Sequence, residues 1–108
     1  MSERNTFYKG YVELLVLRFL SEDDYYGLQL VKKIKEESNG LINLSVGTLY
    51  PTLYKLIEKK YITDYKVQTG ERMIKVFYHI ENLGRERLDR LIKDYNELTI
   101  IMNNIIGH

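Results

Sequence analysis

The chain has 108 residues, of which 44% are apolar and 29% charged, proportions typical of one globular domain rather than of a disordered segment. It has no cysteine, which excludes disulfides and thiolate chemistry and leads us to expect a cytoplasmic protein. The net charge of +1 does not by itself indicate a nucleic-acid partner. The longest apolar run, residues 14–20, is interrupted by Arg18 and is too short to cross a membrane, and the polar first five residues predict no signal peptide.

Two amphipathic helices are predicted in the first 40 residues. Apolar spacing indicates a helix over about residues 6–21, with Tyr11, Leu14 and Leu17 on faces too broad for one neighbour to cover. A second helix is predicted over about residues 25–38, with Asp23 or Asp24 as its N-cap. It ends at a Ser-Asn-Gly sequence, because glycine tolerates the left-handed backbone that terminates helices. A short connection to a third helix would complete a helix-turn-helix.

The third predicted helix, over about residues 45–60, is the most informative segment. Its apolar stripe contains Val46, Leu49, Leu53, Leu56 and Ile57. The opposite face carries hydroxyls, lysines and bordering tyrosines, a chemistry that suits DNA bases and phosphates, although an ordinary solvated face would look the same.

The start of this third helix has two alternatives. If Ser45 is the N-cap, Pro51 lies in the second turn and crowds the carbonyl of Gly47. If Thr48 is the N-cap, Pro51 lies in the first turn, where proline is tolerated.

A β-hairpin is predicted over about residues 61–80. Strand-forming residues lie on both sides of a turn at residues 68–71, and the second strand alternates with a period of two. A hairpin directly after a helix-turn-helix is the order of a winged helix. Between Ser45 and Ile80 six cations accompany three acids, a local net charge of +3 that favours phosphate contacts.

The last segment, residues 81–108, is predicted as a long helix with a heptad seam. Little of its own domain is left to cover it, so we expect a dimerisation helix that meets a second chain and also packs with the first helix; an intramolecular core helix is the alternative. The predicted seam consists of Leu88, Leu91, Tyr95, Leu98, Met102 and Ile105.

The sequence shows no pattern typical of an enzyme. His79 and His108 have no serine or carboxylate at a recognisable spacing, and neither a Gly-rich phosphate loop nor a metal-ligand spacing is present. We therefore expect no catalytic residues, metal or cofactor. A winged helix used only for protein interaction is the competing function.

Four stretches resemble the PadR family of transcriptional regulators: residues 9–17, 26–27, 47–56, and 76–81 with Gly84. The Gly-Thr-Leu-Tyr-Pro sequence at 47–51 is the most specific of them. The length and single C-terminal helix resemble the short branch, which includes multidrug-sensing regulators. The resemblance implies a third helix that starts near Ser45 and bends where Gly47 relieves the crowding by Pro51. The chain departs from the family at two positions. Glu81 stands where many members have a Thr that caps the last helix, which leaves Asn82 as another candidate cap. Tyr95 stands where drug-binding relatives have Trp.

These observations predict an α+β, mostly α, winged helix-turn-helix protein, with a DNA-binding domain over 1–80 and a dimerisation helix over 81–108. The seam predicts a homodimer, and two-fold symmetry would place its two recognition helices about 34–36 Å apart, at successive major grooves of a palindromic double-stranded DNA operator. The resemblance implies that this regulator is a repressor. It also implies a small aromatic, phenolic or drug-like effector at the dimer axis, although Tyr95 could merely fill the seam. The expected DNA contacts are Tyr26, Lys32, Lys33, Ser45, Thr48, Tyr50, Thr52, Lys55, Arg72 and Lys75, and the expected effector contacts are Phe7, Tyr11, Leu91, Tyr95, Leu98 and Met102.

Overall fold

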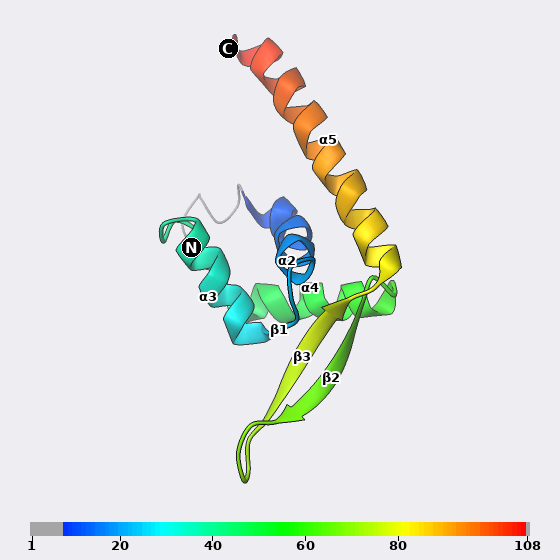
Figure 1. The fold of residues 1–108 in the computed structure, drawn as a ribbon. Coiled ribbons are helices and arrows are strands. Elements are labelled where there is room, and N and C mark those ends of the chain that lie inside the picture. Colours follow the sequence, from blue (N-terminus) through cyan, green and yellow to red (C-terminus); the bar gives the residue numbers. More distant parts are fainter. Residues whose placement is uncertain (1–7, 108) are drawn as a thin grey trace.

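The computed structural model describes residues 8–107 and confirms the predicted winged helix-turn-helix with a long C-terminal helix (Figure 1). Besides the helical elements the fold contains a small three-stranded antiparallel sheet of order β1-β3-β2. In chain order the elements are η1 (Lys9–Tyr11), α2 (Val12–Leu20), β1 (Tyr25–Tyr26), α3 (Gly27–Glu37), α4 (Val46–Glu58), β2 (Ile62–Gln68), β3 (Ile74–Ile80) and α5 (Asn82–Ile106).

The core lies where α2 meets α3, α4, β3 and the start of α5. Leucine, isoleucine and valine side chains fill most of it, together with Phe19 and Tyr78. A large apolar side chain contributes about 1.5–3 kcal/mol when fully buried. The largest fully buried side chains are Leu17, Leu20, Leu30, Leu49, Leu53, Leu56, Ile62, Ile80 and Val16. The apolar stripe of the third helix is confirmed by its three leucines, but Val46 is 52% exposed. Val46 is the first residue of α4 and does not join its buried leucines, so the periodicity wrongly assigned it to the buried stripe.

The wing is the β2–β3 hairpin, which projects away from the helices (Figure 1). Ile62 pairs with Ile80 at its base, where both side chains are buried, whereas Gln68 pairs with Ile74 near the exposed tip. The hairpin predicted over 61–80 is thus present, and its base is anchored in the core while its tip is solvated.

The start of the second helix differs from the prediction. Tyr25 and Tyr26 form a strand that pairs with Tyr78 and Phe77 of β3, and the helix begins only at Gly27. Neither Asp23 nor Asp24 is its N-cap; Tyr26 occupies that position, and its N–H donates to the side-chain oxygen of Gln29 at 3.0 Å. Residues 25 and 26 are not helical because they pair with β3. Their partners lie about fifty positions later in the chain, so a local sequence pattern could not predict this pairing.

The C-terminal helix α5 extends well beyond the other elements (Figure 1). With this helix included, the longest dimension of the described structure is 58 Å. Its first turns pack on α2, where Arg87 donates to both carboxylate oxygens of Glu13 at 2.9 and 3.3 Å. Glu81 is its N-cap residue but makes no capping bond with its side chain, which instead accepts a hydrogen bond from Thr63 at 2.7 Å. Among the helices of residues 8–107, none has the length and apolarity to span a membrane.

Candidate nucleic-acid interface

Ser45 caps the third helix, which resolves the two alternatives for its start. The Ser45 Oγ accepts the backbone N–H of Thr48 at 3.2 Å and donates to the Thr48 hydroxyl oxygen at 3.1 Å. Helix α4 then continues through Pro51 to Glu58, as the longer of the two alternatives requires. The local bend at Gly47 stays a prediction.

The outer face of α4 is a row of exposed residues opposite the buried leucines. It contains Gly47, Pro51, Tyr54, Lys55 and Glu58. Tyr54 is 62% exposed, although the sequence pattern placed it only at the border of this face. A residue five positions after Leu49 lies on the opposite side of a helix with 3.6 residues per turn, so this signal was available in the sequence. Tyr54 therefore joins the candidate DNA contacts.

The remaining polar residues of α4 lie on its flanks and are only half-exposed. Thr52 donates its hydroxyl to the carbonyl of Thr48 at 3.0 Å. Tyr50 packs against Gly27, where an added Cβ would overlap the phenol ring. Tyr50 thus packs between α4 and the start of α3, and its ring is only partly exposed to a ligand.

The wing and the start of α3 are joined by a row of aromatic side chains. The Lys75 Nζ lies 4.3 Å from the centre of the Tyr26 ring and 3.2 Å from its hydroxyl oxygen. Tyr26 contacts Phe77 edge-to-face at 5.4 Å, and Phe77 stacks on Tyr65 at 5.7 Å. Of the predicted DNA contacts, the structure therefore brings Tyr26 and Lys75 together directly.

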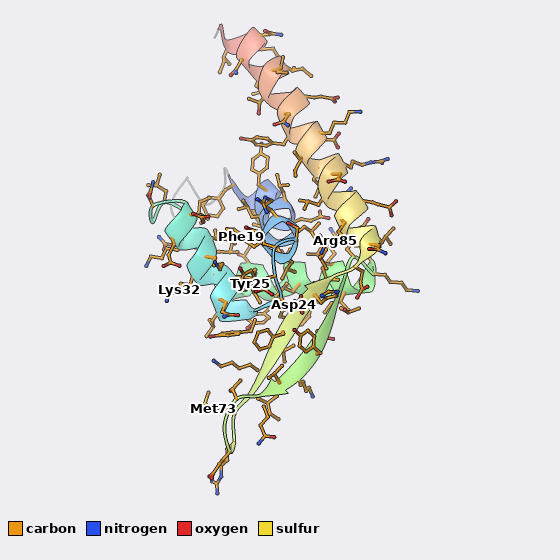
Figure 2. The ribbon with its side chains drawn as sticks, viewed as in Figure 1. Phe19, Asp24, Tyr25, Lys32, Met73 and Arg85 are labelled. Atoms are coloured by element: carbon orange, nitrogen blue, oxygen red, sulfur yellow. The ribbon has the colours of Figure 1, made fainter. Side chains whose placement is uncertain are left out.

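The other predicted cations occupy exposed or half-exposed positions around this unit. Lys32 lies on the side of α3 that faces away from α2 (Figure 2). Lys33 holds its Nζ 5.1 Å from the centre of the Tyr25 ring. Arg72 is exposed in the turn of the wing, directly before Met73 in the chain.

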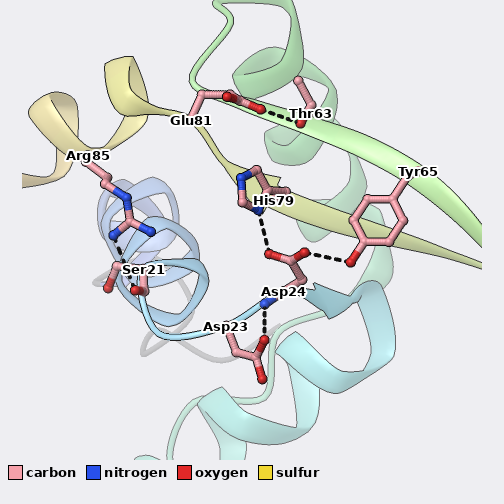
Figure 3. Close-up of polar contacts among 8 residues, drawn as sticks. All are labelled: Ser21, Asp23, Asp24, Thr63, Tyr65, His79, Glu81 and Arg85. Carbon is pink, nitrogen blue, oxygen red and sulfur yellow. Dashed lines mark hydrogen bonds and ion pairs between the residues drawn. The ribbon is translucent and has the colours of Figure 1, made fainter.

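A polar network at the base of the wing was not foreseen from the sequence (Figure 3). The Asp24 carboxylate accepts a hydrogen bond from the Tyr65 hydroxyl at 2.6 Å and contacts the His79 Nδ1 at 2.7 Å. Burial alone would raise the pKa of Asp24, but these bonds outweigh it and hold that pKa below its ordinary value. The bond to Asp24 likewise raises the pKa of Tyr65. Both strands of the wing thus contact Asp24, in the loop that precedes β1.

The predicted seam of α5 divides into a buried and an exposed part. Leu88 is buried in the chain's own core, and Leu91 is half-buried against it. The later members are exposed, and the exposed fraction reaches 74% at Ile105. The exposed part consists of Tyr95, Leu98, Met102 and Ile105.

A groove of about 140 Å³ lies between α5 and the segment formed by η1 and the start of α2. Four predicted effector residues line it: Tyr11, Leu91, Tyr95 and Leu98. The Tyr11 and Tyr95 rings meet edge-to-face, 5.6 Å between centres. Met102 is not among the lining residues, and Phe7 lies outside the residues that the structure describes.

Similar folds occur among solved regulators. A transcriptional regulator from Clostridium thermocellum superposes with a TM-score of 0.88 over 94% of this chain and 99% of its own, at 24% identity. Bacillus subtilis PadR, solved in complex with operator DNA, has a TM-score of 0.69 and 22% identity, and the match covers 75% of this chain and 46% of that one. At these identities the likeness shows the fold.

Two sequence relatives are similar to the chain, and a family model gives the family. An uncharacterized protein from Lysinibacillus sphaericus is 26% identical over 100 residues, covering 93% of this chain and 92% of that protein. The transcriptional regulator YqjI of Escherichia coli is 37% identical over 65 residues, but this covers 60% of the chain and only 31% of YqjI. The model of the transcriptional regulator PadR-like family matches residues 16–90, well over half of the sequence. The chain therefore belongs to the PadR-like family of transcriptional regulators, and it is not an enzyme.

Proposed function

We propose that this chain acts as a homodimeric repressor that binds a palindromic DNA operator and is released by a small aromatic effector. The observation that carries the DNA-binding part is the outer face of α4, which lies free of the core beside a wing attached to α3. Hydroxyl and phenol groups suit base edges, while lysine and arginine pair with phosphates. The contacts we propose are the predicted set of Tyr26, Lys32, Lys33, Ser45, Thr48, Tyr50, Thr52, Lys55, Arg72 and Lys75, together with Tyr54.

The exposed part of the α5 seam supports the dimer. Tyr95, Leu98, Met102 and Ile105 recur at helical spacing and are 44–74% exposed in the single chain. Burying apolar surface releases about 25 cal/mol per Å² on average, so a second copy of this stripe is a favourable partner. Two-fold symmetry would then present two α4 helices to successive major grooves of a palindromic site.

The effector site is proposed at the same axis. One chain supplies a groove of only about 140 Å³, whereas small-molecule pockets span about 300–1,000 Å³. A second subunit would enlarge the groove, with Tyr95 of each chain facing the ligand. A ligand that binds one spacing of the two α4 helices better than the other would shift the dimer and release DNA.

The decisive test is fluorescence anisotropy with DNA from upstream of the protein's own gene and with scrambled DNA, at several salt concentrations. Specific binding with a linear dependence of log Kd on log salt is the expected result. Absence of binding even at low salt would refute the proposal and favour a protein-interaction module. Aromatic compounds are then screened for loss of the anisotropy signal.

The dimer is tested by analytical ultracentrifugation of a matched pair of variants. Leu98→Glu places a charge on the exposed seam, whereas Asn104→Glu places the same charge on another face of α5. We expect Leu98→Glu to sediment as a monomer and Asn104→Glu as a dimer. A dimer in both variants would show that α5 does not associate through this seam.

A further inference from the structure

A basic groove lies between the segment formed by η1 and the start of α2 and the C-terminal half of α4. It has a volume of about 210 Å³, enough for a phosphate group and several waters, each of which occupies about 30 Å³. It is lined by Lys9, Gly10, Val12, Glu13, Thr52, Lys55, Leu56 and Lys59. Two of its three lysines, Lys9 and Lys59, have no place in the set of DNA contacts named above.

The charges around this groove are unbalanced in favour of an anion. Glu13 is its one acid, and both carboxylate oxygens of Glu13 already accept hydrogen bonds from Arg87. Bonding to Glu13 is the largest influence on Arg87 and raises the pKa of its guanidinium. Within residues 8–107, none of the three lysines forms an ion pair. The ammonium groups are therefore free to bind a negative ligand.

The groove is continuous with the outer face of α4. Lys55 belongs to both, since it is exposed on that face and also lines the groove. A DNA duplex that receives α4 in its major groove presents a phosphate backbone along each side of the helix. The backbone on the side of Lys55 would pass over Lys9 and Lys59.

We infer that this groove is a phosphodiester-binding site, in which Lys9 and Lys59 hold the DNA backbone beside α4. The inference rests on the proposed DNA-binding function and extends it to a contact from the first helical segment. Each phosphate contact adds about 0.9 to the magnitude of the slope of log affinity against log salt. Each lysine occurs twice in a symmetric dimer, so removing it lowers that magnitude by about 1.8.

The test measures this slope for Lys9→Ala, Lys59→Ala and the control Lys93→Ala, by anisotropy with the same duplex. Lys93 is exposed on α5 and carries the same charge, so its loss leaves the slope unchanged. We expect each groove variant to show a shallower slope and, at 0.1 M salt, roughly tenfold weaker binding per lost contact. Lys9→Arg and Lys59→Arg keep the positive charge and should restore most of the slope.

The outcomes separate this inference from the proposed function. If the wild-type protein binds its duplex with a clear salt slope and both groove variants keep that slope, the inference is wrong and the DNA-binding proposal stands. Binding of wild type, but not of Lys9→Ala, to vesicles containing phosphatidylglycerol, with an unchanged DNA slope, would instead assign the groove to lipid headgroups and overturn the inference. A wild-type protein that binds no DNA refutes both proposals.

Discussion

At Gly84 helix α5 approaches the backbone of Tyr61 closely, and replacing this glycine by alanine tests that packing. An added Cβ would overlap the carbonyl oxygen of Tyr61 and lie 2.8 Å from Cγ1 of Ile80 and 3.0 Å from the carbonyl carbon of Tyr61. The same Tyr61 carbonyl accepts the N–H of Glu81 at 2.9 Å, so the backbone on both sides is tied down. The first turn of α5 must therefore move if a methyl group is introduced.

The expected cost follows from two opposing terms. Overpacking of a rigid site costs about 1–3 kcal/mol or more, while alanine in a helix gains at most about 1 kcal/mol over glycine. We expect Gly84→Ala to lower the free energy of unfolding by about 2 kcal/mol, which corresponds to a Tm lower by roughly 10 °C for a domain of this size.

Thermal unfolding followed by circular dichroism, at one fixed protein concentration, measures this difference. The control is Gly10→Ala, since a Cβ at Gly10 has nothing within 4 Å. The control should be neutral or slightly stabilising. A Tm for Gly84→Ala equal to or above that of the wild type would refute the claim that α5 is seated tightly on the Tyr61 backbone.

Three further predictions concern the cap, the Asp24 network and a buried phenol. Ser45→Ala removes the acceptor for the Thr48 N–H and should cost about 1 kcal/mol in urea unfolding, whereas Ser45→Asp should retain most of the stability. The folded-state pKa of Asp24 lies below the ordinary value of 3.8, so the stability that the ionised carboxylate contributes is present above that pH and is lost as the pH falls through the folded pKa. The free energy of unfolding of Asp24→Asn should therefore depend less on pH than that of the wild type in this acid range. Equal profiles would contradict the role of the network. Burial raises the pKa of Tyr78 to about 12, so its ionisation should be the late step in an ultraviolet titration and should disappear in Tyr78→Phe.

Local chemistry was sufficient for most of the secondary structure. The spacing of Leu49, Leu53 and Leu56 specifies which face of α4 is buried, because a helix with 3.6 residues per turn gathers those positions on one side. The alternation of residues 74–80 and the turn before them specify the hairpin in the same way. Ser45 as the cap was one of two alternatives, and the hydrogen bond to Thr48 decided between them.

The parts of the candidate site that depend on distant neighbours could not be read from the sequence. Asp24 looks like a helix cap locally, yet Tyr65 and His79 lie 41 and 55 positions away and engage its carboxylate. Tyr50 has the character of a ligand contact, but Gly27 leaves a space that its ring fills.

The sequence by itself therefore determined the order of helices and strands, the polar face of α4 and the apolar stripe of α5, since each depends on residues a few positions apart. Only the tertiary structure decided which of these surfaces remain free. It covered Leu88 and exposed Ile105, and it placed Lys9 beside Lys55 and Lys59 in one groove. The physical reason is that burial and electrostatic balance depend on distances through space, and the packing of α2 against α4 and α5 sets those distances.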